Sequence, residues 1–257
     1  MPSPAGLSAA DSPGDPERSP LLSARSSSPS ASMRSPNAVS LLLRRSFSDT
    51  AAVAAQVGLV VSTAVLWRIL WTHPAGLFTY HPSFQSLALV GFLEGVLLLQ
   101  PQPNNLAVKR KGLQLHQAFQ YASLGAILTG AGFIVYNKAI HGAKHITTWH
   151  ALFGLLTLAL ILLQITFGAL VVYSPLQRIL GGEERAKRLW KYHRMSGYLT
   201  LTLLIATPLL ALASDWVRLN STAFERWTIG LGLGVAGVGV GARVQTSKLG
   251  IQRARSQ

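Results

Sequence analysis

The chain has 257 residues, of which 49% are apolar and only 12% are charged. This profile does not suit a soluble domain, and the recurring windows of about 20 mostly apolar residues are long enough to cross a bilayer core. The chain contains no cysteine, which excludes disulfides, iron-sulfur clusters and thiolate metal sites, so any metal would need histidine or oxygen ligands.

The first 48 residues are rich in Ser, Pro and Arg and show no apolar periodicity, so we predict a disordered tail over residues 1–48. No apolar stretch precedes a small-residue cleavage site, which argues against a secretory signal. A mitochondrial presequence is the alternative, but three acidic residues and several prolines in the tail argue against it. The stretch ERSPLL, from Glu17 to Leu22, resembles the acidic dileucine signals that direct membrane proteins to endosomes, lysosomes or vacuoles.

Six apolar stretches follow the tail, and each is long enough for one transmembrane helix. We therefore predict an all-α integral membrane bundle of six helices over residues 49–246, followed by a basic tail at 247–257. The last stretch, GLGLGVAGVGVGAR, partly mimics a glycine-rich nucleotide loop, but it lacks the strand and turn of such loops and is interpreted as a packing face. The stretches lie at roughly 51–71, 82–100, 114–136, 149–173, 193–213 and 227–246.

The net charge of +14 is divided unevenly between the two sides of the predicted bundle. By the positive-inside rule, the more basic side is cytosolic and holds both termini, as an even number of spans requires. We interpret the basicity as a sign of topology rather than of nucleic-acid binding. The basic side carries Arg44, Arg45, Lys109, Arg110, Lys111, Arg178, Arg185, Lys187, Arg188, Lys191, Arg243, Lys248, Arg253 and Arg255, whereas the opposite loops carry only Lys138, Lys144, Arg218 and Arg226, with Arg68 near a helix end.

Four consecutive predicted spans each carry one histidine in their first turns. His81 and His150 begin spans 2 and 4 from the non-cytosolic side. His116 and His193 begin spans 3 and 5 from the cytosolic side. One interfacial histidine could simply cap a helix, but four of them on alternating sides indicate a function, because an ionisable group in a bilayer costs free energy unless it is paired or ligated.

By depth these histidines form two pairs, one near each membrane face. A zinc site would normally need three or four ligands at one depth, whereas two facing imidazoles suit the axial positions of a haem iron. In HALFG and HRMSG a glycine follows the histidine by four residues, on the same helix face, where it would leave room for a flat porphyrin. The other histidines, His73, His141 and His145, lie in predicted loops, where we expect them to be exposed.

These motifs resemble the cytochrome b561 family, and specifically its short, single-module proteins. The resemblance implies a six-helix membrane protein whose central four helices, spans 2–5, hold two b-type haems and which passes electrons across the membrane. It assigns axial ligation of the haem irons to His81, His116, His150 and His193. The match covers roughly residues 51–246 and rests on FTYHPSFQSLA with Glu94, KRKGLQLHQAFQ with His116 and Gln120, HITTWHALFG followed by Gln164 and Gly168, and YHRMSGY around His193.

The resemblance also implies cytosolic ascorbate as the donor and monodehydroascorbate or a ferric chelate as the acceptor on the other side. In relatives, basic residues three and four positions before the span-3 histidine help to hold ascorbate, but here these positions are Gly112 and Leu113. Cationic side chains near a haem would attract and orient such anions. The candidate donor contacts are Lys109, Arg110, Lys111, Lys191 and Arg194, and the candidate acceptor contacts are Lys138, Lys144 and His145.

Three hypotheses for the function follow. The first is a transmembrane oxidoreductase that carries electrons between small molecules, the second is a haem-bearing membrane subunit that passes electrons to a partner enzyme, and the third is a haem-free transporter or scaffold. A homodimer is a candidate assembly, and no nucleic-acid partner is expected. Because a charge deep in a span is costly, we expect Glu94 to be protonated or hydrogen-bonded to a neighbour such as Gln120 or Gln164.

Overall fold

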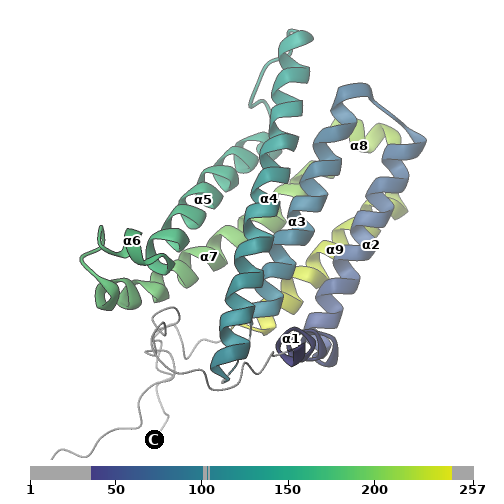
Figure 1. Cartoon of the computed structure of the whole chain (residues 1–257). Coiled ribbons are helices and arrows are strands. Elements are labelled where there is room, and N and C mark those ends of the chain that lie inside the picture. The colour runs from purple at the N-terminus through teal and green to yellow at the C-terminus, as the bar shows by residue number, and fades with distance from the viewer. Residues whose placement is uncertain (1–35, 101–102, 104, 245–257) are drawn as a thin grey trace, which may run out of the picture. The chain divides into compact units, whose positions relative to one another are not determined.

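Helices make up all the regular secondary structure of the described residues, which are 36–100, 103 and 105–244 of this computed structural model (Figure 1). Each predicted apolar stretch forms one long helix, which confirms the all-α membrane bundle. The long helices are α2 (Thr50–Thr72), α3 (Tyr80–Leu99), α4 (Leu106–Ile140), α5 (Trp149–Val172), α7 (Glu183–Ala211) and α9 (Ala223–Ala242). The short ones are α1 (Pro36–Ser48), η2 (Gly76–Thr79), α6 (Ser174–Gln177) and α8 (Asp215–Asn220).

Among the described residues, five helical segments are long and apolar enough to cross a membrane, namely α2, η2 with α3, α4, α5 and α7. Helix α9 has 20 residues, but it is not one of the five. It contains Glu225, Arg226 and many glycines, which are less apolar than the leucines and valines of a typical span. The sixth span and the cytosolic position of both termini therefore stay predictions.

The long helices associate as three pairs, because α3 packs along α4, α2 along α9, and α5 along α7 (Figure 1). In the α2/α9 pair, a Cβ atom built on Gly232 would lie 2.7 Å from the carbonyl oxygen of Gly58. Only glycine permits this approach of the two backbones. This contact confirms that the glycine-rich stretch of α9 is a packing face.

The buried core lies mainly where α3 meets α2 and α9. Leu59 of α2, Leu93 and Leu97 of α3, and Ala236 of α9 are almost completely buried there. In contrast, the α3/α4 pair makes few contacts with the α5/α7 pair. Space is therefore left between these two pairs, and the span histidines lie on the four helices that border it.

Helix α1 corrects the prediction that the chain is disordered up to residue 48. Residues Pro36–Ser48 are helical, and Ala38 and Leu42 bury their side chains against Val108 of α4. A helix of 13 residues is marginal alone, so its stability comes from this packing, which the sequence pattern does not reveal. Residues 1–35 and 245–257, which include ERSPLL and the predicted basic tail, lie outside the described residues.

Arg243, which is only 6% exposed, ties together the ends of three helices. Its Nη1 lies 2.8 Å from Oδ2 of Asp49, the residue before α2, and its Nη2 donates to the carbonyl oxygen of Gln100 at the end of α3. Asp49 also caps α2, since its Oδ1 accepts from the N–H groups of Ala51 and Ala52 at 3.0 and 3.1 Å. Burial raises the pKa of Asp49, but the Ala52 N–H and the Arg243 charge lower that pKa below its ordinary 3.8.

We expect Asp49→Asn to lower thermal stability, because it removes the ion pair with Arg243 but keeps a capping side chain. Asp49→Ala should cost about 1 kcal/mol more, because the cap is lost as well. A carboxyl whose folded-state pKa is depressed stabilises the fold above its unfolded-state pKa and loses this effect as the pH falls through the folded-state pKa. The wild type should therefore lose its advantage over Asp49→Asn below pH 3.8 but keep part of its advantage over Asp49→Ala, because a protonated Asp49 can still accept from the Ala51 and Ala52 N–H groups.

Circular dichroism of the protein in detergent, recorded during heating at pH values above and below 3.8, measures these differences. Equal melting temperatures for the wild type and Asp49→Asn at neutral pH would show that the Arg243 ion pair does not stabilise the bundle.

Candidate functional site

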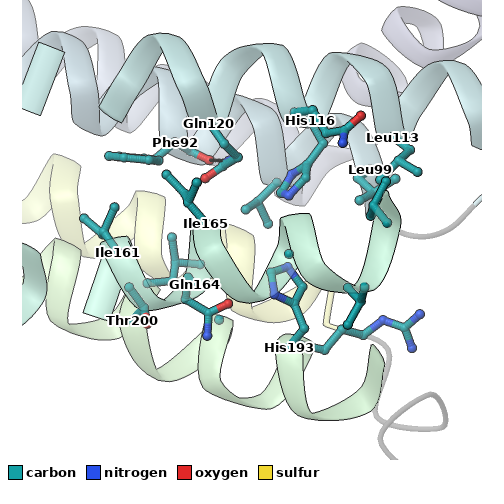
Figure 2. Close-up of a pocket in the computed structure, with 18 of the residues that line it drawn as sticks. Phe92, Leu99, Leu113, His116, Gln120, Ile161, Gln164, Ile165, His193 and Thr200 are labelled. Atoms are coloured by element: carbon teal, nitrogen blue, oxygen red, sulfur yellow. Dashed lines mark hydrogen bonds between the residues drawn. The ribbon is translucent and has the colours of Figure 1, made fainter. Parts of the chain in front are cut away.

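The structure brings the four span histidines together as two pairs. His116 of α4 and His193 of α7 line one cavity, and their rings face each other across it (Figure 2). His81 of α3 and His150 of α5 have ring centroids 6.1 Å apart. We name these arrangements the His116 site and the His81 site.

The two sites lie at different depths of the bundle. Helix α4 contributes to both, because it carries His116 and, 14 residues later, Gly130, whose carbonyl oxygen lies 2.9 Å from Nδ1 of His81. Fourteen residues of α-helix rise by about 21 Å. Since the hydrocarbon core of a bilayer is about 30 Å thick, the two sites divide its thickness between them.

Three of the four histidines bond to the backbone of the helix that packs along their own helix. A carbonyl oxygen can only accept, so each Nδ1 carries a proton and donates it to this bond, and Nε2 is left with a free lone pair. This tautomer is the one in which Nε2 can bind a metal, and the Nδ1–H bond fixes the orientation of the ring. The three bonds are His81 Nδ1 to Gly130 O (2.9 Å), His116 Nδ1 to Gly95 O (3.0 Å) and His150 Nδ1 to Thr207 O (2.9 Å).

Glycines allow α3 and α4 to approach closely enough for these bonds. A Cβ atom on Gly95 would lie 2.9 Å from Cβ of Phe119, and one on Gly130 would lie 3.1 Å from Cβ of Phe84. Neither glycine was among the residues predicted from the sequence. The available signal was that spans 2 and 3 each hold a glycine 14 residues after their histidine.

His193 has different neighbours. The side-chain amide of Gln164 in α5 faces it, with one amide atom 3.0 Å from Nδ1. Gly168, one turn further along α5, lies against the ring, because a Cβ atom there would be 3.0 Å from Cε1 of His193. By contrast, Cβ atoms on Gly154 and Gly197 would meet their nearest side-chain atoms at an ordinary 3.6 Å, so their role as clearance for a porphyrin stays a prediction.

Each site has a feature that suits a haem. The cavity at the His116 site has about 1200 Å³ of space not filled by atoms, open solvent at its mouth included, and its walls are mainly apolar side chains such as Phe92, Ile161 and Ile165. At the His81 site the spacing of the rings is informative. An imidazole nitrogen binds a metal ion at about 2 Å, so two rings on opposite sides of one ion have centroids about 6 Å apart.

The residues predicted to contact the donor are not equivalent. Arg194 lines the cavity of the His116 site, together with Trp190 and Gln117, which the sequence analysis did not single out. Lys191 is exposed, and Arg110 and Lys111 are partly exposed. Lys109 is only 7% exposed, so its side chain is poorly placed to meet a soluble donor.

On the other side, the residues predicted to contact the acceptor lie in the last turn of α4 and in the loop between α4 and α5. Lys144, His145 and His141 are exposed in this loop, and His73 is exposed after α2, in agreement with the prediction that these histidines are exposed. Lys138 differs, because its Nζ donates to the carbonyl oxygen of Lys144 at 3.0 Å. This bond gives Lys138 a structural part in closing the loop that precedes His150.

Glu94 bonds to a residue that was not among its predicted partners. Its Oε2 accepts from Nε2 of Gln56 in α2 at 3.1 Å, and Gln56 also lies 3.2 Å from Oγ of Ser46 in α1. The expected partner Gln120 donates instead to the carbonyl oxygen of Phe92, and Gln164 lies beside His193. Consecutive residues of a helix point about 100° apart, so Glu94 faces α2 while the adjacent Gly95 faces α4.

Comparison with known proteins gives a family match. The family model described as eukaryotic cytochrome b561 matches residues 80–218. The chain is 32% identical over 181 residues to transmembrane reductase CYB561D2 of Bos taurus, and 31% identical over 181 residues to that of Homo sapiens; both alignments cover 69% of this chain and 78% of the relative. It is 29% identical over 162 residues to probable transmembrane reductase CYB561D1 of Mus musculus, covering 61% of this chain and 68% of the relative. No solved structure matches.

The contact between Gly168 and His193 leads to a test. We expect Gly168→Ala to displace the His193 ring and to weaken haem binding at the His116 site roughly tenfold or more, while the His81 site is unaffected. Haem titration of the purified protein, followed by its absorption spectrum, measures this loss. Gly125→Ala is the matched control, because a Cβ atom on this exposed residue of α4 meets nothing within 4 Å. Equal haem affinity in the two variants would contradict the prediction.

Proposed function

Because the chain belongs to the cytochrome b561 family, we propose that it is a transmembrane oxidoreductase that moves single electrons across the bilayer. The observation that carries this proposal is the presence of two histidine pairs at separate depths, one lining a mainly apolar cavity and the other with the ring spacing that suits a single metal ion. The names of the relatives, which are transmembrane reductases, support it. Bound haem b supplies reversible one-electron chemistry.

In this proposal, His116 and His193 hold one haem b, and His81 and His150 hold the second. The Nδ1–H bonds to Gly95, Gly130 and Thr207 keep three of the imidazoles in the ligating tautomer and increase their basicity. The apolar walls of the cavity exclude water from the His116 site.

We propose that a small anionic reductant, ascorbate in the first instance, meets the His116 site from the cytosol. Arg194 lines the cavity itself, and Lys191, Arg110 and Lys111 lie at the same end of the bundle. Their positive charges would raise the local concentration of an anion and orient it. Lys109 is left out of this set because it is buried.

We propose that the acceptor, monodehydroascorbate or a ferric chelate, meets the His81 site from the non-cytosolic side. The exposed Lys144 and His145 lie within six residues of His150 in the chain. The positive-inside rule does not favour lysine on this side, so its presence supports a role in binding an anion. The ERSPLL stretch supports an endolysosomal or vacuolar membrane as the location.

The alternative is a membrane subunit that passes electrons to a partner enzyme. Protein of this kind would bind haem but would not respond to ascorbate or ferric chelate unless its partner were added. A haem-free transporter or scaffold would bind no haem at all.

Single histidine substitutions test the assignment of ligands. We expect His193→Ala to remove about one haem equivalent and His150→Ala to remove the other, because the two histidine pairs form separate sites at different depths. The pyridine haemochrome assay and the protein concentration together give haem per chain. His145→Ala, which alters an exposed histidine, should retain both haems. Loss of both haems from each single variant, with the helical content unchanged, would contradict independent sites.

Charge neutralisation tests the acceptor face. In vesicles that are loaded with ascorbate and exposed to external ferric chelate, Lys144→Gln should slow iron reduction by about twofold or more at low salt, because the anion is attracted less strongly. The difference should shrink as salt rises, because the screening length falls to about 10 Å at 0.1 M. Lys187→Gln, at the other end of the bundle, is the charge-matched control. If Lys144→Gln and the control reduce iron equally fast at low salt, Lys144 does not contact the acceptor.

A further inference from the structure

The four helices that carry the paired histidines share one register. Each has a histidine and, 14 residues later, the residue that contacts the histidine of the helix it packs along. The contacts are reciprocal within α3/α4 and within α5/α7, so the second pair repeats the arrangement of the first. The residue pairs are His81 and Gly95 in α3, His116 and Gly130 in α4, His150 and Gln164 in α5, and His193 and Thr207 in α7.

One of the four contacts is chemically different from the others. Three histidines bond to a backbone carbonyl oxygen, whereas Nδ1 of His193 faces a side chain, the amide of Gln164. Figure 2 shows this amide on the α5 side of the cavity, beside the His193 ring. A backbone carbonyl cannot be removed by substitution and can only accept, but a glutamine side chain can be replaced and can turn either its oxygen or its nitrogen toward the ring.

Ligation of a metal by Nε2 of His193 decides which amide atom must face the ring, because Nδ1 then carries a proton and needs an acceptor. Oγ of Ser196 donates to the carbonyl oxygen of Tyr192 at 2.7 Å, so its lone pairs are left to accept, and Nε2 of Gln164 donates to it. With the nitrogen used in this way, Oε1 faces Nδ1 of His193 at 3.0 Å and can accept from Nδ1–H. The opposite amide orientation satisfies the neighbours of Gln164 when Nδ1 of His193 is unprotonated, because the Gln164 nitrogen then lies 3.2 Å from the carbonyl oxygen of His193 and the Gln164 oxygen lies 3.0 Å from the Gly197 N–H. That orientation puts the imidazole proton on Nε2 of His193, so ligation through Nε2 requires the amide to turn its oxygen toward Nδ1.

We propose that Gln164 is a positioning residue whose amide oxygen accepts from Nδ1–H of the ligating His193, orients its ring and thereby tunes the haem of the His116 site but not that of the His81 site. This inference rests on the proposed function. The Oε1 acceptor increases the electron-donating strength of the His193 imidazole through its Nδ1–H. Hydrogen bonding to an axial ligand is one of the means by which a protein sets a haem potential.

The strength of the acceptor at residue 164 should therefore set the reduction potential at one site. In Gln164→Leu the Nδ1–H loses its acceptor, the imidazole donates less electron density, and the potential of the His116-site haem should shift upward. In Gln164→Glu a carboxylate accepts more strongly, so the same potential should shift downward. The potential of the other haem should stay at its wild-type value in both variants.

Two controls separate this role from packing. Thr207→Val changes the residue at the equivalent position of the register, but His150 bonds to the backbone carbonyl of Thr207, which the variant retains. Gln120→Leu removes another amide that lines the same cavity, one that donates to the carbonyl oxygen of Phe92. Thr207→Val should leave both potentials at their wild-type values, and any shift in Gln120→Leu, which measures the loss of an amide from the cavity wall alone, should be smaller than the shift in Gln164→Leu.

The experiment is a potentiometric titration of the full chain in detergent, with optical spectra and electron paramagnetic resonance to resolve the two haems. Opposite shifts of one potential in Gln164→Leu and Gln164→Glu support the proposal. Unchanged potentials in both variants, or a shift in Gln164→Leu equal to that in Gln120→Leu, would overturn it. If Gln164→Leu fails to bind haem at the His116 site, the proposal requires that Gln164→Glu still binds haem there. Failure of both variants to bind it would assign Gln164 to packing and overturn the proposal. A wild type without haem would instead refute the proposed function.

Discussion

The structure depends on one constraint, which is that an imidazole placed inside a bilayer must have both ring nitrogens satisfied without water. Nδ1 is satisfied within the chain, by a carbonyl oxygen in His81, His116 and His150 and by an amide in His193. Nε2 is then left for a ligand. The tight helix pairs and the glycines between them bring each Nδ1 to its partner. The space between the pairs leaves room for a ligand at Nε2.

The three helix pairs contribute differently to this arrangement. Close contact of α3 with α4 and of α5 with α7 brings each histidine within reach of its Nδ1 partner. The α2/α9 pair supplies the rest of the buried core. Arg243 ties the start of α2 and the end of α9 to the end of α3. The α3/α4 pair and the α5/α7 pair barely touch, and the His116 cavity lies between them. Bound haem would add the contacts that these two pairs lack, so ligand binding should also stabilise the bundle.

Much of this could be predicted from the sequence, and the rest could not for identifiable reasons. Hydropathy and spacing located the long helices and the histidine pairs, because apolar length and histidine depth are local properties of the chain. The predicted partners of Glu94 were wrong, because Glu94 bonds to Gln56, which lies on a helix whose rotation no local pattern fixes. The helix at Pro36–Ser48 was missed because its stability comes from packing on α4. The 14-residue register was visible in the sequence, but only the packing of the helices shows what it is for.

The central claim is that one chain holds two haem b groups in two separate bis-histidine sites. The most direct measurement is the number of haems per chain in the purified protein, combined with an optical redox titration in the presence and absence of ascorbate. Two low-spin haems per chain that titrate as two one-electron steps, both reduced at least in part by ascorbate, are expected. A chain that binds one haem or none while its helices stay intact would contradict the claim.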